Sequence, residues 1–102
     1  MRVTIQQSDV EPMTITMKIE GRVAGGLVSE LQRAWRDLAP SLGGRRVVVD
    51  LRGVTHVDET GRKVLADIYE VTRAKFLADT PLTKYFAEDA QNRIRTRSES
   101  ID

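Results

Sequence analysis

A short apolar run near the middle of the chain most constrains the fold. Val47, Val48 and Val49 are followed by Asp50 and Leu51, so that apolar and β-branched side chains point to both faces of a strand. A strand has this composition when it lies inside a sheet that is covered above and below, usually beside a parallel neighbour. The run therefore predicts a central strand.

Hydrophobic periodicity predicts the remaining elements. Strands alternate apolar and polar residues, whereas helices repeat apolar residues every three to four positions. The predicted strands lie near residues 2–7, 13–20, 47–51 and 76–78, with a turn at residues 8–12, and the predicted helices begin near Leu27, Thr60 and Pro81. The order β-β-α-β-α-β-α predicts a single α/β domain, with helices packed on a mixed four-stranded sheet.

The length of 102 residues suits one domain, which we expect to comprise residues 1–91. Residues 92–102 show no workable periodicity, and a frayed helix end followed by a disordered tail is the simplest interpretation. Arg93, Arg95 and Arg97 in this segment could instead contact an acidic partner or phosphates.

Composition excludes several classes of function. The 16 Lys and Arg residues against 15 Asp and Glu give a net charge of +1, which disfavours nucleic-acid binding through bulk charge. The chain has no cysteine, so disulfides and thiolate metal sites are excluded. The first residues do not resemble a signal peptide, and the sequence has no run of about 20 apolar residues, so we expect a cytoplasmic protein that does not insert into membranes.

The segment between the apolar strand and the second helix carries most of the functional groups. It holds His56, Asp58, Glu59, Thr60 and Gly61 at the carboxyl end of a strand, where α/β sheets usually bind their ligands. A structural interpretation is that Asp58 or Thr60 caps the helix, while the negative charge of Glu59 interacts favourably with the positive end of the helix dipole. A metal or acid–base site is disfavoured, because one imidazole beside two adjacent carboxylates is a poor ligand set. We expect no catalytic residue, no metal and no cofactor.

Residues 49–61 also resemble the central motif of STAS domains (sulfate transporter and anti-sigma factor antagonist). In that motif a hydrophobic strand and Asp-Leu lead to Asp-Ser-Ser/Thr-Gly and a helix. The resemblance extends to residues 15–23, which match the family's second strand, and to residues 31–42, which match its first helix and turn. It covers residues 3–75 and implies a STAS-like domain.

The resemblance implies a regulatory module that binds another protein and has no catalysis of its own. In anti-sigma factor antagonists the unphosphorylated domain binds a kinase-type anti-sigma factor, which phosphorylates the Ser or Thr before the glycine. Thr60 occupies that position here. A phosphate would add about −1.5 to −2 charges to a surface that must lose water on binding, so Thr60 is the predicted switch. The predicted partner-binding residues are Asp58, Glu59, Thr60, Gly61, Arg62 and Lys63.

Three positions depart from the family pattern. Glu59 stands where the family often has Ser, and its negative charge beside Thr60 would hinder a kinase or alter the choice of partner. Arg62 and Lys63 replace smaller, mostly apolar residues and bring positive charge to a first helical turn, where the helix dipole disfavours it. We therefore suspect a functional role for both cations.

Two further possibilities remain open. The chain could be the STAS subunit of an ABC-type phospholipid transport system, with the same helix face docked on the ATPase. A homodimer through the edge hairpin or the third helix is also compatible with the sequence. An enzyme is the least favoured class, because no catalytic constellation can be assembled.

Overall fold

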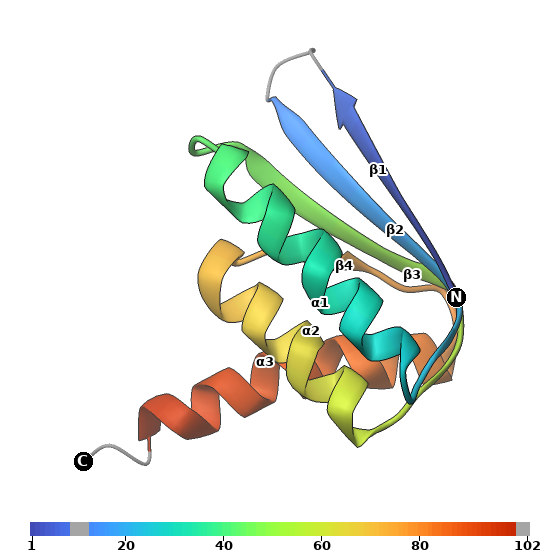
Figure 1. Ribbon diagram of the computed structural model, residues 1–102. Coiled ribbons are helices and arrows are strands. Elements are labelled where there is room, and N and C mark those ends of the chain that lie inside the picture. The colour runs from blue at the N-terminus through green and yellow to red at the C-terminus, as the bar shows by residue number, and fades with distance from the viewer. Residues whose placement is uncertain (9–12, 100–102) are drawn as a thin grey trace.

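The computed structural model describes residues 1–8 and 13–99 and contains one four-stranded sheet with three α-helices (Figure 1). In chain order the elements are β1 (Arg2–Ser8), β2 (Thr14–Val23), α1 (Leu27–Leu38), a 3₁₀ turn (Ala39–Ser41), β3 (Arg46–Val57), α2 (Glu59–Thr72), β4 (Lys75–Leu77) and α3 (Pro81–Glu99). This order confirms the α/β class and the predicted sequence of elements. Most of the turn expected at residues 8–12 lies outside the described residues.

The sheet has the strand order β1-β2-β3-β4, with β1 antiparallel to β2 and with β3 parallel to both β2 and β4. The apolar run therefore lies in an interior strand with parallel neighbours, as the sequence predicts. That strand is longer than residues 47–51, because β2 continues to pair with β3 as far as the Val23–Val57 pair. The segment expected to be a loop after Leu51 is thus mostly strand.

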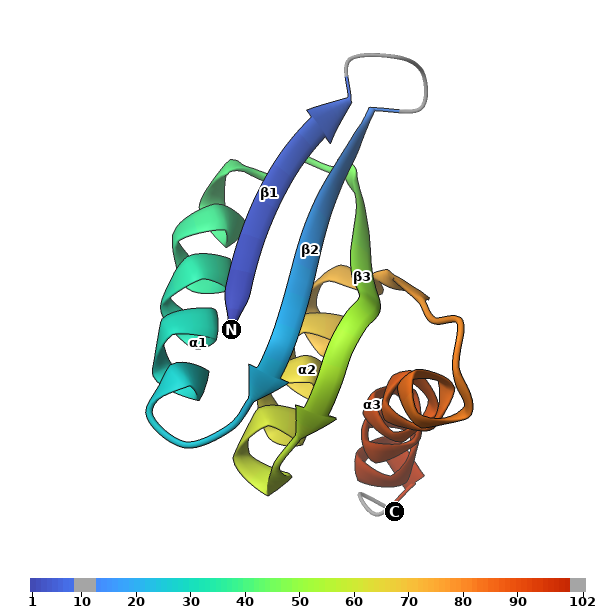
Figure 2. The same ribbon diagram turned by 90° about the vertical axis from the view of Figure 1, so that its right-hand side faces the viewer.

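Helices α1 and α2 cover one face of the sheet, while α3 packs against α2 and β3 (Figures 1 and 2). Val47 and Val49 are buried beneath α1 and α2, whereas Val48 on the opposite face is only partly buried. The expectation that both faces of this strand are covered is therefore wrong at Val48. The main core lies between the sheet and the two helices, where Leu31, Trp35 and other apolar side chains meet.

Helix α3 does not end where the sequence suggests. Residues 92–99 continue it, which corrects the expectation of a frayed or disordered segment there; residues 100–102 lie outside the described part of the chain. Phe86, Ala90 and Ile94 recur every four residues and are all buried, so the helix is held by packing as far as residue 94. Its start is capped as expected, since the Thr83 N–H donates to the Thr80 hydroxyl at 3.1 Å.

Among the described residues, no helix combines the length and the apolarity that crossing a bilayer requires.

Candidate functional site at the start of helix α2

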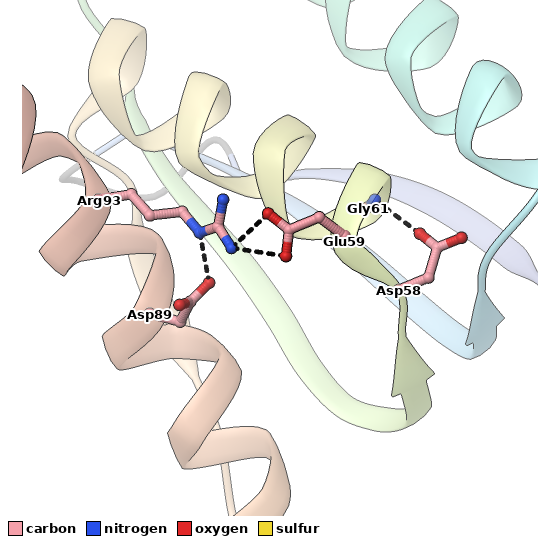
Figure 3. Close-up of polar contacts among 5 residues, drawn as sticks. All are labelled: Asp58, Glu59, Gly61, Asp89 and Arg93. Carbon is pink, nitrogen blue, oxygen red and sulfur yellow. Dashed lines mark hydrogen bonds and ion pairs between the residues drawn. The ribbon is translucent and has the colours of Figure 1, made fainter.

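Asp58 links the start of α2 to the loop between β2 and α1, at one end of the sheet. It is the N-cap of α2, and its Oδ1 accepts a hydrogen bond from the Gly61 N–H at 2.8 Å (Figure 3). Its Oδ2 accepts from the Gly25 N–H at 2.9 Å, in the loop that precedes α1. These N–H donors of Gly25 and Gly61 lower the pKa of the Asp58 carboxyl group below its usual value. Asp58 therefore holds the site together and has both carboxylate oxygens engaged.

Glu59 is tied to the third helix through Arg93. The Arg93 Nη2 lies 2.8 Å from Glu59 Oε1 and 2.9 Å from Oε2, and its Nε lies 2.8 Å from an Asp89 oxygen (Figure 3). The negative charge next to Thr60 is thus paired within the protein. Sequence reasoning placed Arg93 in an irregular tail and missed this contact, although the i,i+4 spacing of Asp89 and Arg93 is a helical signal.

Thr60 is the second residue of α2, and its side chain is exposed. It makes no side-chain hydrogen bond with any described residue, so its hydroxyl is accessible to another protein. The first turn of a helix carries partial positive charge, and its first N–H groups have no partner within the helix. A phosphate on Thr60 would therefore meet a favourable field on its own helix.

Gly61 is buried against the ends of two strands. A Cβ atom at this position would lie 2.8 Å from Cγ1 of Val57 and 3.0 Å from the carbonyl oxygen of Val23. The absence of a side chain lets the first turn of α2 approach β2 and β3 closely. Gly61 is thus placed beneath the surface that Thr60 presents.

Arg62 and Lys63 have different roles in the structure. The Arg62 guanidinium lies 5.4 Å from the centroid of the Tyr85 ring and 5.3 Å from that of Phe86, so it packs between α2 and α3. This contact supplies the structural reason for Arg62 that the sequence did not reveal. Lys63 is exposed and forms no ion pair with a described residue.

The six predicted partner-binding residues therefore divide into two groups. Asp58, Gly61 and Arg62 make contacts within the domain, and they support the first turn of α2 from below. Glu59, Thr60 and Lys63 are exposed, and we call these three the α2 surface. His56 is exposed on β3, and the described residues contain no cluster of three or more side chains suited to a metal ion.

A second charged pair, which sequence reasoning did not identify, lies on the face of the sheet opposite α1 and α2. Asp50 is only 4 % exposed, and its Oδ1 accepts hydrogen bonds from the backbone N and the Nε of Arg52, both at 3.0 Å. Its Oδ2 accepts from the Arg52 Nη2 at 2.9 Å. The side-chain hydrogen bonds from Arg52 are the main reason that the pKa of Asp50 lies below its usual value.

This pair predicts a pH dependence of stability. An unfolded Asp titrates with a pKa of about 3.9, and the folded state holds the Asp50 carboxylate to a lower pH. Its contribution to stability is therefore fully present above about pH 4 and is lost as the pH falls through the lower folded-state pKa. We expect the urea midpoint of unfolding to decrease as the pH is lowered below about 4. In the Arg52→Gln variant this decrease should be less steep. Asp58 acts with the same sign and remains in both proteins, so identical pH profiles would contradict the assignment to Asp50.

Comparison with known proteins identifies the fold. No family model and no curated protein matches the sequence. The structure of SpoIIAA, an anti-sigma factor antagonist in its unphosphorylated form, aligns with 90 % of this chain and 98 % of its own, at a TM-score of 0.54 and 12 % identity. The structure of Mglu aligns with 76 % of this chain at a TM-score of 0.57 and 18 % identity, but the match spans only 19 % of the Mglu chain. The chain thus has the STAS fold of SpoIIAA, which confirms the fold that the sequence motif implied.

Proposed function

We propose that this chain is a non-catalytic regulatory module of the anti-sigma factor antagonist type. It acts in the cytoplasm, binds a kinase-type anti-sigma factor through the α2 surface, and is switched by phosphorylation of Thr60. In this way it would regulate transcription. The observation that carries the proposal is the exposed, unbonded Thr60 side chain on a first turn whose neighbouring residues are fixed by contacts within the domain.

The surroundings of Thr60 suit both a binding surface and a switch. Arg93 offsets the negative charge of Glu59. This reduces the electrostatic repulsion between Glu59 and the phosphate group that a kinase would bring to Thr60. Docking would take the Thr60 hydroxyl out of water at a modest cost when the partner supplies a hydrogen bond to it. A phosphate of about −1.5 to −2 charges would cost far more to desolvate. Because Asp58 and Gly61 hold the turn in place, we expect the added charge to change affinity without unfolding the helix.

The test begins with the partner. An affinity pull-down from the native cell, followed by mass spectrometry, should recover a small GHKL-type kinase. Thr60→Asp should then weaken binding of that kinase more than tenfold, or about 1.4 kcal/mol, with the circular dichroism spectrum unchanged. Ser41→Asp, which adds the same charge at an exposed position after α1, serves as the matched control and should leave affinity unchanged.

Two outcomes would contradict this proposal. Unchanged affinity in a folded Thr60→Asp protein would show that Thr60 is no switch. Stable recovery of an ABC ATPase, in a complex insensitive to Thr60→Glu, would place the chain in a transport system instead. Mass spectrometry of the protein purified from its own cell tests the modification itself, since the proposal requires phosphate on Thr60.

Arg62 and Lys63 provide a second test. Substituting Lys63 should change the affinity for the kinase, whereas substituting Arg62 should change the stability of the domain. Lys63→Ala should weaken kinase binding severalfold without changing the urea midpoint, since Lys63 is exposed. Arg62→Ala should lower the unfolding free energy by roughly 1 kcal/mol, because it removes a cation from two aromatic rings. Equal losses of affinity in the two folded variants would show that both cations contact the partner.

A further inference from the structure

A basic pocket lies at the end of the sheet opposite to Thr60. The cavity has a volume of about 590 Å³, and four cationic residues line it: Arg45, Arg46, Arg73 and Lys75. We call these four residues and the space between them the basic pocket. Its volume falls within the range of about 300–1,000 Å³ that is usual for small-molecule sites.

The topology brings the four cations together from separate parts of the chain. Arg46 pairs with Thr14 of β2, and Val48, two residues later on the same face of β3, pairs with Lys75 of β4. Arg46 and Lys75 therefore stand on the same face of neighbouring strands. Arg45 precedes β3, and Arg73 lies in the connection between α2 and β4. The pocket thus forms where two connections meet the start of β3 and β4.

The charge of the pocket contrasts with that of the whole chain. No carboxylate occurs among the described residues that line it, although the chain as a whole has a net charge of only +1. Like charges on neighbouring strands, as at Arg46 and Lys75, repel each other, and a bound anion would relieve that repulsion. Such a concentration of charge in a concave site also attracts anionic ligands.

Helix stability accounts for one of the four cations. Arg73 is the C-cap of α2, where the helix dipole favours a positive charge, and its guanidinium lies 5.1 Å from the centroid of the Tyr69 ring. Arg45, Arg46 and Lys75 belong to no helix, so this explanation does not extend to them. Arg45 has a contact of its own, because its guanidinium group donates to the side-chain oxygen of Gln7 on β1. The placement of Arg46 and Lys75 side by side calls for a separate reason.

We infer that the basic pocket binds a small ligand that carries two or more linked phosphate groups. Arginine guanidinium groups match phosphate oxygens with paired hydrogen bonds, and lysine adds a point charge. The cavity is concave, which suits a compact anion better than the broad surface of an acidic protein. Because β3 rises roughly 3.3 Å per residue along its 12 residues, the pocket is well separated from the α2 surface.

Titration with two probes tests this inference. Inorganic tripolyphosphate and ATP are added separately, without divalent metal and at physiological salt, while amide signals are followed by NMR and affinity by calorimetry. We expect saturable shifts at residues 44–48 and 72–75. Equal affinity for both probes would mean that the phosphate chain alone is recognised, and tighter ATP binding would add a contact to the nucleoside. Absence of saturable shifts with either probe would overturn the inference.

Matched variants separate a site from general attraction of charge. Arg46→Gln with Lys75→Gln should weaken binding at least tenfold. Arg22→Gln with Lys84→Gln removes the same two residue types from exposed positions outside the pocket, and should change affinity less than twofold. Equal weakening by both pairs would show non-specific attraction and contradict the inference. If the first pair fails to fold, Arg46→Gln alone carries the test, since Arg46 is exposed and lines the pocket.

Binding at this pocket is independent of the proposed switch. Thr60→Asp should leave the affinity for tripolyphosphate unchanged, since Thr60 lies at the other end of β3. Loss of phosphate binding with intact kinase binding would therefore count against the pocket only.

Discussion

Replacing Ile94 by alanine should lower the free energy of unfolding by about 2–5 kcal/mol, the usual cost of truncating a fully buried aliphatic side chain. Ile94 is 4 % exposed and lies near the far end of α3. Its burial means that α3 belongs to the packed domain as far as residue 94, beyond the boundary predicted at residue 91. Arg93, the residue before Ile94, also connects α3 to α2 through its ion pair with Glu59.

Leu82→Ala is the matched control for this substitution. Leu82 lies on the same helix and has a side chain of similar size, but it is 46 % exposed, so its truncation should cost less than about 1 kcal/mol. Trp35 is the only tryptophan and is buried in the core, so its fluorescence reports urea unfolding in every variant. Equal urea midpoints for Ile94→Ala and the parent protein would show that the end of α3 is not packed.

The value of this test lies in the link between α3 and the candidate site. Arg93 sits one residue before Ile94, and it neutralises the carboxylate beside Thr60. If α3 frayed from residue 92, Glu59 would keep an unpaired charge next to the proposed phosphorylation position. The packing of Ile94 thus supports the electrostatics of the α2 surface from a distance.

Local sequence patterns predicted most of the fold correctly. The alternation at residues 13–20 and the helical spacing after Leu27 depend on one face being buried, and that dependence is visible within ten residues of sequence. The end of α3 was not predicted because its apolar stripe is narrow. Beyond Ala87, the buried Ala90 and Ile94 are separated by polar and charged residues, and so the stripe does not stand out in the sequence.

The sequence predicts which residues gather at the start of α2, but it does not predict which of them contact the rest of the domain. Helix-capping preferences offered Asp58 or Thr60 as the cap of α2, and the structure shows that the cap is Asp58. The partners of Glu59 and Arg62 come from α3, more than 20 residues away in sequence, and no local pattern reveals such contacts. The Asp50–Arg52 pair was not predicted, because a single Asp in an apolar run does not indicate how the Arg52 side chain lies.

The largest effect at the site itself is expected from Gly61. Its absent Cβ would lie 2.8 Å from Val57 Cγ1 and 3.0 Å from the Val23 carbonyl oxygen, neither of which is the free end of a flexible side chain. Gly61→Ala should therefore lower the unfolding free energy by about 1–3 kcal/mol, the usual range for overpacking. This cost exceeds the gain of up to about 1 kcal/mol that alanine offers inside a helix. Gly61→Val, with two more methyl groups, should cost more than Gly61→Ala.

Gly26→Ala supplies the control, because a Cβ at Gly26 would meet nothing within 4 Å and its φ of −62° suits any residue. Its urea midpoint should stay close to that of the parent protein. If Gly61→Ala were equally neutral while it weakened kinase binding, the glycine would serve the partner and not the packing of α2. If instead Gly61→Ala lowers the stability and the folded fraction still binds the kinase, Gly61 is required for the packing of the domain. In that case the close approach of α2 to β2 and β3 is what holds Thr60 at the surface.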